Sequence, residues 1–157
     1  MSELTLGPFE LADEQATIKL GACLAPLARA GTCIFLVGPL GAGKTTLVRS
    51  LLRSLGHGGA VRSPTYNLME NYQLGELSLL HLDLYRLGDP EEVEYLGLRE
   101  MLDDSCLLVE WPDRGIGFLP APDVVIHLGY KKQGRTAHLE VKNGLSFDLE
   151  RKFKNIS

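Results

Sequence analysis

The feature that most constrains the fold of this chain is a glycine-rich segment at residues 38–46, GPLGAGKTT. It fits the pattern G-x-x-x-x-G-K-[ST] and follows an apolar, β-branched run at residues 32–37, TCIFLV. Beyond the segment, apolar residues recur at helical spacing, and Gly56 lies where a C-terminal cap would end the helix. These residues are Leu47, Val48, Leu51, Leu52 and Leu55. The sequence therefore predicts a strand, a loop and a helix in succession.

A loop of this kind is suited to phosphate. The N-terminus of a helix presents unpaired N–H groups and a partial positive charge, and glycines let the backbone wrap closely around an anion. Lys44 would reach the β- and γ-phosphates, and the Thr45 hydroxyl would bind Mg²⁺. The alternative is a glycine turn followed by a solvated lysine, but the flanking strand and helix favour phosphate binding. The expected contacts are Gly38, Pro39, Leu40, Gly41, Ala42, Gly43, Lys44, Thr45 and Thr46.

Composition narrows the class of protein. The 157 residues suffice for one domain, and 45% hydrophobic with 23% charged residues is ordinary for a soluble protein. No apolar run approaches the ~20 residues that span a bilayer, and the first residues do not resemble a secretory signal. We therefore expect a cytoplasmic protein that does not enter the membrane. A net charge of −4 argues against direct binding to nucleic acid, and the basic residues at 151–154 are interpreted as a solvated tail.

The cysteines and histidines show no local pattern of metal binding. Three cysteines in apolar surroundings, Cys23, Cys33 and Cys106, form no C-x-x-C pair, so buried thiols are expected. The four histidines are not spaced as metal ligands either. The only metal expected is therefore one that arrives with a nucleotide.

The remaining pattern alternates between helix and strand. Residues 13–30 read as a helix capped by Asp13 and closed by Gly31, and a second helix starts at Pro90 and could continue past Gly97. The expected strands are residues 65–73 and 77–85, joined by a hairpin at Gly75, then 105–110, 124–130 and 136–142. We predict one α/β P-loop NTPase domain over residues 1–145, with a mixed sheet of parallel core and antiparallel strands flanked by helices. Residues 146–157 would form a C-terminal tail.

Three further segments could carry chemistry. Glu110 ends a buried-type strand, where P-loop proteins place an acid that holds Mg²⁺; the alternative is a surface glutamate. Thr65 follows Pro64 in a loop that could sense the γ-phosphate or could simply be a rigid turn. Strand alternation puts His81, Asp83 and Tyr85 on one face, where a phosphate, a Mg²⁺ shell or an attacking water could be their partner. An exposed polar face is the alternative there.

Taken together, these segments resemble the TsaE family, also called YjeE, bacterial P-loop ATPases needed to make the threonylcarbamoyladenosine of tRNA. The resemblance rests on the first helix at residues 12–17, the phosphate loop, and four motifs. These are SPTY at 63–66, HLDLYR at 81–86, DPEEVEYLG at 89–97 and VEWP at 109–112. It covers nearly all of the first 125 residues. Leu82 and the Pro39-Leu40 pair depart from common residues of the family, without removing a phosphate ligand.

The resemblance implies roles for particular residues. It makes Thr45 and Glu110 the Mg²⁺ ligands and Asp83 a catalytic carboxylate or one that supports the metal site. It makes the loop with Thr65 a switch, and Trp111 a reporter of bound nucleotide. Thr17 matches a threonine near the nucleotide. The implied cofactors are ATP and Mg²⁺, and the implied partners are TsaB and TsaD, so that tRNA is reached only through the complex.

Two other functions remain open at this point. A small-molecule kinase would share the phosphate loop but needs an arginine-bearing lid, and residues 113–117, DRGIG, are short for one. A nucleotide-dependent binding module would never need to hydrolyse ATP. Phosphate release, measured with and without small acceptors, separates these possibilities from an ATPase.

Overall fold

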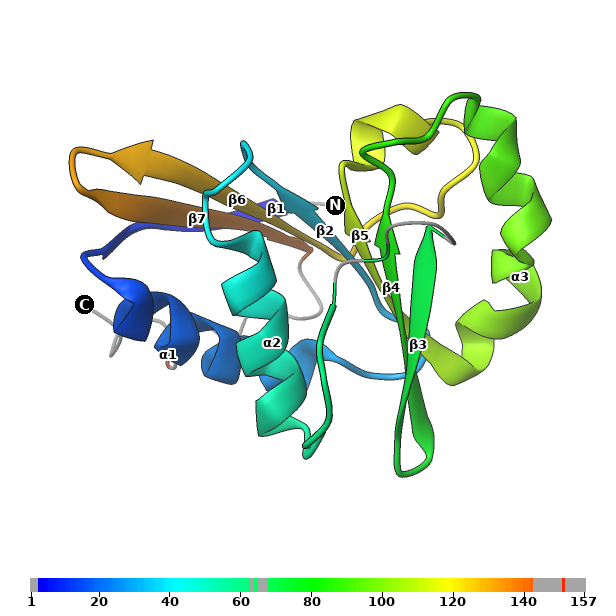
Figure 1. The fold of residues 1–157 in the computed structure, drawn as a ribbon, viewed down its shortest axis with the longest axis horizontal. Helices are drawn as coiled ribbons and strands as arrows, with labels where there is room; N and C mark the ends of the chain where they lie inside the picture. Colours follow the sequence, from blue (N-terminus) through cyan, green and yellow to red (C-terminus); the bar gives the residue numbers. More distant parts are fainter. Residues whose placement is uncertain (1–2, 63, 65–67, 143–150, 152–157) are drawn as a thin grey trace.

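The computed structural model describes residues 3–62, 64, 68–142 and 151, and its centre is one seven-stranded sheet (Figure 1). The strand order is β1-β7-β6-β2-β5-β4-β3. The strands are β1 (Glu3–Leu11), β2 (Cys33–Val37), β3 (Met69–Leu74), β4 (Leu77–Asp83), β5 (Ser105–Glu110), β6 (Val124–Lys131) and β7 (Gly134–Lys142). The α-helices are α1 (Glu14–Leu24), α2 (Lys44–Ser54) and α3 (Leu98–Met101). In the described part of the chain, the 3₁₀ helices are η1 (Ala25–Leu27), η2 (Pro90–Leu96), η3 (Leu102–Asp104) and η4 (Pro112–Gly115).

The sheet is mixed, as the sequence predicts. Strand β2 pairs in parallel with β5 and with β6, and β4 pairs in parallel with β5. Antiparallel strands extend this core on both sides, β3 on one edge and β7 followed by β1 on the other. Every residue of β5 is buried, as expected for a parallel strand covered on both faces.

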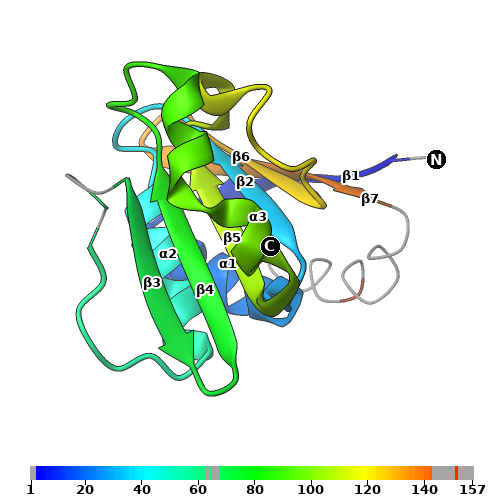
Figure 2. The same cartoon turned by 90° about the vertical axis from the view of Figure 1, so that its right-hand side faces the viewer.

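Helices cover both faces of the sheet (Figures 1 and 2). One face packs against α1 and α2 through a large apolar cluster that includes Leu20, Leu51 and Ile126. The other face of β2, β5 and β4 packs against η2, α3 and the segment after β5, through a second apolar cluster that includes Leu82 and Val93. No helix in the described part of the chain is both long enough and apolar enough to cross a membrane.

The first helix is shorter than the sequence suggests. Asp13 caps α1 as predicted, since its side chain accepts a hydrogen bond from the Ala16 N–H at 3.0 Å. The helix ends at Leu24 and continues only as the 3₁₀ turn η1, well before residue 30. Pro26 explains the difference, because proline has no N–H to donate and its ring clashes with the preceding turn.

The strand, loop and helix around the phosphate loop form as predicted, and so does the hairpin of β3 and β4. Gly75 lies in its turn with φ of 66°, and the two strands pair from Met69 opposite Leu82 to Leu74 opposite Leu77. The predicted start of β3 at residues 65–67 lies outside the described residues. Strands β5, β6 and β7 also match their predicted positions closely.

Two further elements differ from the prediction. The segment from Pro90 forms the 3₁₀ helix η2 and stops at Gly97, whose φ of 72° is left-handed, so the expected helix does not run through this glycine. Strand β1 was not predicted; it pairs antiparallel with β7, more than a hundred residues later in the chain. The predicted tail at residues 146–157 lies almost entirely outside the described residues, and its boundary stays a prediction.

Candidate functional site

The phosphate loop connects the buried strand β2 to α2 at the carboxyl end of the parallel strands. Gly43 is the N-cap of α2 with φ of 101°, a left-handed conformation that side chains other than glycine rarely adopt. Gly38 lies so close to β6 that a Cβ there would be 2.6 Å from the Leu128 carbonyl oxygen. Both glycines are therefore required by the backbone path, which presents the first N–H groups of α2 to a ligand.

Lys44 is buried at the start of α2. Its Nζ donates a hydrogen bond to the Gly38 carbonyl oxygen at 2.6 Å and lies 4.0 Å from the centroid of the Trp111 ring. Burial lowers the pKa of Lys44, whereas the nearby carboxylates of Glu110 and Asp83 raise it. An ammonium group that has lost solvent in this way gains strongly from an anionic ligand such as a phosphate.

Two carboxyl groups reach this place from neighbouring strands. Asp83 ends β4 and Glu110 ends β5, and the parallel register sets the two residues directly side by side. Glu110 is only 3% exposed, although it is ionisable. The surface-glutamate alternative is therefore excluded by its burial.

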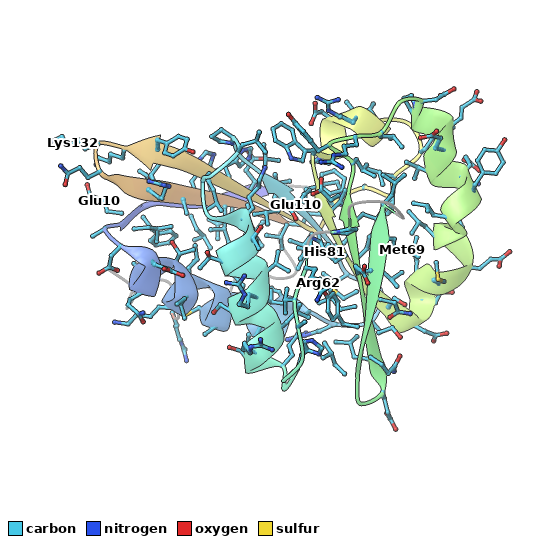
Figure 3. All side chains as sticks on the ribbon, viewed as in Figure 1. Glu10, Arg62, Met69, His81, Glu110 and Lys132 are labelled. Carbon is cyan, nitrogen blue, oxygen red and sulfur yellow. The ribbon has the colours of Figure 1, made fainter. Side chains whose placement is uncertain are left out.

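His81 is the partner of Glu110. Its Nε2 lies 2.6 Å from Glu110 Oε2, and the histidine is 1% exposed. Figure 3 places both side chains in the middle of the molecule, beside α2. Strand alternation in the sequence predicts that His81 and Asp83 share one face. The partner that we expected for His81 was a phosphate, a Mg²⁺ shell or a water. The structure instead gives it a protein carboxylate, which it orients.

Asp83 lies in a less buried position. Its Oδ1 accepts a hydrogen bond from the Tyr85 N–H at 3.1 Å. Burial raises the pKa of Asp83; the Tyr85 hydrogen bond lowers it, and the charge of Glu110 raises it. The Asp83 carboxyl group, which lies beside the Lys44 ammonium group and the Glu110 carboxyl group, is therefore more readily protonated than an aspartate in water.

A pocket of about 310 Å³ collects these groups on one side of the loop. It is lined by Leu40, Gly41, Gly43, Lys44, Thr45, Thr46, Asp83, Tyr85, Glu110 and Trp111. We call it the carboxylate pocket. Its hydroxyl and carboxylate oxygens are the ligand type that Mg²⁺ prefers, and they face the N-terminus of α2. The donor set therefore fits Mg²⁺ bound together with phosphates.

A second pocket of about 280 Å³ lies on the other side of the loop, and we call it the hairpin pocket. It is lined by Leu11, Ala12, Asp13, Glu14, Thr17, Gly41, Gly43, Thr46, Gln133, Gly134 and Arg135. Thr17 is 3% exposed, and its Cγ2 lies 3.6 Å from where a Cβ on Gly43 would be. The structure thus puts Thr17 against the loop, and its contact with a nucleotide stays a prediction.

Not every predicted contact faces a pocket. Ala42 is fully buried in the apolar core, and its N–H donates to the Pro39 carbonyl oxygen at 3.2 Å within the loop. Neither residue, nor Gly38, is among those that line the two pockets. The predicted contacts of these three residues with a nucleotide stay a prediction. Thr65, predicted to act in catalysis, lies outside the described residues.

Aromatic rings form one wall of the carboxylate pocket. Trp111 follows Glu110 with a left-handed φ of 56°, which turns its ring toward the loop, and its centroid is 5.0 Å from that of Tyr85. Arg114 lies over the Tyr85 ring, with 5.2 Å between its Cζ and the ring centroid. Trp111 therefore lines the pocket beside the phosphate loop, and its role as a reporter of bound nucleotide stays a prediction.

The β6–β7 hairpin also contributes to the site, which the sequence did not predict. The Tyr130 hydroxyl donates a hydrogen bond to the Leu40 carbonyl oxygen, and Arg135 Nε donates to the Gly41 carbonyl oxygen at 3.2 Å. The Arg135 Cζ also lies 4.4 Å from the Tyr130 ring centroid. The hairpin therefore holds the tip of the phosphate loop. No local pattern identifies these residues, because they lie some 90 positions from the loop.

Comparison with known proteins gives a consistent family. The family model described as "Threonylcarbamoyl adenosine biosynthesis protein TsaE" matches residues 11–137. The chain is 42% identical over 123 residues to the tRNA threonylcarbamoyladenosine biosynthesis protein TsaE of Haemophilus influenzae, covering 78% of each chain. It is 38% identical over 145 residues to the protein of the same name from Nostoc sp., covering 88% of each.

A solved structure supports the fold independently. The crystal structure of YdiB from Bacillus subtilis matches with a TM-score of 0.76, covering 98% of this chain and 95% of that one. Sequence identity in this match is 24%, so it bears on the architecture alone. The mixed sheet flanked by helices is therefore shared with a known structure.

Proposed function

Since the chain belongs to the TsaE family of threonylcarbamoyl adenosine biosynthesis proteins, we propose that it is a Mg²⁺-dependent ATPase serving that tRNA modification. The observation that carries the proposal is the convergence in one pocket of a helix N-terminus, a buried lysine and two adjacent carboxyl groups. A lysine that can bind phosphate, beside two carboxyl groups that can hold a metal ion and a water, is the arrangement that transfer of a phosphoryl group needs.

Each residue has a defined part in this proposal. The N–H groups at the start of α2 hold the phosphates, and Lys44 exchanges its hydrogen bond to Gly38 for the β- and γ-phosphate oxygens. Thr45 and Glu110 would hold Mg²⁺, with the Glu110 carboxylate fixed by His81. When bound, the ion neutralises the charge that moves as the bond between the β- and γ-phosphates breaks.

Asp83 is the candidate for positioning the attacking water. It lies at the pocket next to Glu110, and the Tyr85 N–H fixes one of its oxygens. A carboxyl group whose pKa is raised by burial can accept a hydrogen bond from water and share its proton during the reaction. Water would attack the γ-phosphorus, and the bond to the leaving ADP oxygen would break.

The hairpin pocket accommodates the nucleoside in this proposal. It adjoins the same loop through Gly41, Gly43 and Thr46, so a ligand with phosphates in the carboxylate pocket can extend into it. Thr17 would then lie near the nucleoside. This arrangement uses both sides of the loop for one molecule of ATP.

Hydrolysis by the chain alone is expected to be slow. Within the described residues, Arg114 packs on Tyr85 and Arg135 donates to the loop backbone, so both arginines beside the pockets have other contacts. A partner that supplies a cation or orders the loop with Thr65 can raise such a rate by roughly 10³–10⁵. We propose TsaB and TsaD as these partners, in the cytoplasm, with tRNA reached only through the complex.

Phosphate release tests the proposal. It would be followed for the parent chain and for Glu110→Gln, each with and without a TsaB–TsaD pair, with circular dichroism as the folding control. Glu70→Gln, an exposed carboxyl on β3, is the matched control. We expect partner stimulation of the parent and of Glu70→Gln but not of Glu110→Gln. Equal rates with and without partners would reject the assembly-dependent ATPase, and transfer of phosphate to a small acceptor would indicate a kinase.

A further inference from the structure

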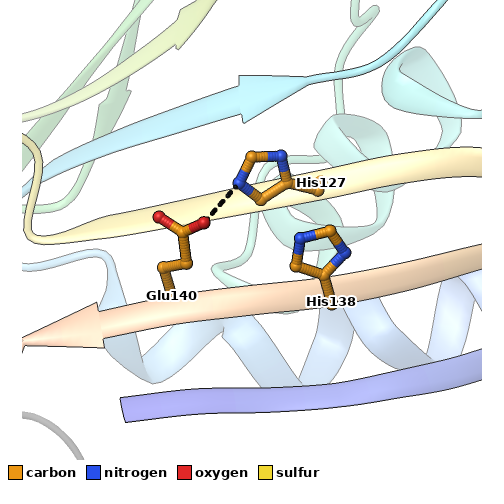
Figure 4. Close-up of side chains that lie close together, drawn as sticks. All are labelled: His127, His138 and Glu140. Atoms are coloured by element: carbon orange, nitrogen blue, oxygen red, sulfur yellow. Dashed lines mark hydrogen bonds and ion pairs between the residues drawn. The ribbon is translucent and has the colours of Figure 1, made fainter. Parts of the chain in front are cut away.

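A second group of potential metal ligands lies on the β6–β7 hairpin, and none of its residues lines the carboxylate pocket or the hairpin pocket. His127 is on β6, and His138 and Glu140 are on β7. Their ligand atoms all lie within 4.8 Å of one another, and all three residues are partly exposed (Figure 4). These three side chains take no part in the proposed ATPase site, so we consider separately which ligand they could bind.

Strand pairing brings these residues together. His127 is directly opposite His138 in the antiparallel register, and Glu140 follows His138 by two positions, which returns it to the same face. The alternate residues of β6, such as Ile126 and Leu128, are buried in the core against α1 and α2. The three polar side chains therefore share the opposite face of the sheet.

We propose that His127, His138 and Glu140 bind a divalent transition metal ion such as Zn²⁺. His127 Nε2 and Glu140 Oε1 are 3.1 Å apart. Two ligands on one tetrahedral zinc ion are separated by about 3.3 Å, given bonds of ~2.0–2.1 Å. Two imidazoles and one carboxylate are a ligand set that suits zinc and similar ions and leaves coordination positions open for water. Mg²⁺, which prefers oxygen ligands, would not compete well.

The second histidine must turn when the ion binds. The rings of His127 and His138 are stacked, with centroids 4.2 Å apart and planes 6° apart. Parallel rings cannot both direct in-plane lone pairs at one ion, so one imidazole has to leave the stack. The side chains of His127 and Glu140 are 30% and 42% exposed, which leaves the group open to an ion from solution. Loss of the ring stack is a signature that mere electrostatic attraction of an ion would not produce.

Zinc titration of the untagged chain in excess Mg²⁺ tests the site, since Mg²⁺ occupies oxygen ligands. Calorimetry would compare the parent with His127→Ala and His138→Ala, and His57→Ala is the matched control because His57 lies far from β6 and β7 in a separate contact with Tyr72. A Cys23→Ser background removes the partly buried thiol as a competing ligand. We expect one bound ion and a loss of affinity of at least about 10-fold in each of the first two variants, but not in the control.

Long-range ¹H–¹⁵N spectra of the parent provide a readout that needs no variant. Zinc should shift the ring signals of His127 and His138 together and leave those of His57 unchanged. Absence of zinc binding in excess Mg²⁺ would overturn the proposal. So would binding that survives loss of both histidines, or binding that leaves the His138 ring signals in place.

Discussion

At the scale of single residues, Lys44 connects the parts of the candidate site. In this structure its ammonium group contacts the carbonyl oxygen of Gly38, at the start of the loop, and the ring of Trp111, which lines the carboxylate pocket. Burial lowers its pKa, so its charged form depends on nearby anions, which are the carboxylates of Glu110 and Asp83 here. Nucleotide phosphates would add to that anionic environment and draw the ammonium away from the indole ring.

Trp111 should therefore report the movement of Lys44. It is the only tryptophan, so the tryptophan emission of the chain, excited selectively over that of the tyrosines, comes from it alone. We expect saturating MgATP to change this emission, and Lys44→Ala to weaken MgATP binding by at least about 10-fold, since a hydrogen-bonded charge is lost. Fluorescence titration and calorimetry measure the two effects. Lys19→Ala, an exposed lysine of α1, should behave like the parent. If Lys44→Ala bound MgATP as tightly as the parent, the loop would have only a structural role.

At the scale of elements, the two sides of the phosphate loop are held differently. Strand pairing fixes one side, because Glu110 lies on β5, which pairs in parallel with β2, and Asp83 lies on β4, which pairs in parallel with β5. The tip of the loop is held from the β6–β7 hairpin, by Tyr130 and Arg135. These contacts use backbone carbonyl oxygens of the loop, so its shape depends on a hairpin that supplies no ligand to the carboxylate pocket.

Removing one hairpin contact should weaken nucleotide binding without unfolding the protein. Tyr130→Phe keeps the ring on which Arg135 lies and removes only the hydroxyl that reaches Leu40. One hydrogen bond contributes about 0.5–1.5 kcal/mol, so MgATP affinity should fall by about 2- to 10-fold. Calorimetry measures the change. Tyr95→Phe, a tyrosine 87% exposed on η2, is the control. Unchanged affinity in Tyr130→Phe would show that the loop keeps its shape without the hairpin.

At the scale of the whole molecule, the central strands have apolar cover on both faces. Cys33 on β2 and Cys106 on β5 lie within this interior, and burial raises the pKa of each thiol to about 12. The sequence predicted buried thiols, and this is correct for these two, whereas Cys23 on α1 is only partly buried. The three cysteines therefore differ in their access to solvent, although their sequence surroundings are similar.

Alkylation should reveal this difference. A thiol of pKa about 12 is thiolate in only about one molecule in 10⁴ at pH 8, and only the thiolate reacts. We expect iodoacetamide to modify Cys23 first and to reach Cys33 and Cys106 only when denaturant opens the sheet. Peptide mass spectrometry over time gives the three rates. Equal rates for the three cysteines in the native protein would contradict the buried positions of Cys33 and Cys106.

The sequence by itself determined those features whose information is local. The strand and the helix on either side of the loop at 38–46 could be predicted, because the glycine pattern and the apolar periodicity lie within about 20 residues. Glu110 could be placed at a strand end because an uninterrupted apolar run precedes it. Helix ends were less predictable. The sequence suggested a helix that continues past Pro26, but α1 ends at Leu24 because Pro26 has no backbone N–H to donate.

Only the tertiary structure decided which distant residues meet. The His81–Glu110 pair depends on the parallel register of β4 and β5, and the contacts of Tyr130 with the loop depend on where β6 lies beside β2. His127, His138 and Glu140 have no metal-ligand spacing in sequence and come together only when β6 and β7 pair. The unpredicted β1 likewise exists because β7 offers it an edge. Such pairings are set by burial and register over the whole sheet, and no local pattern of residues contains them.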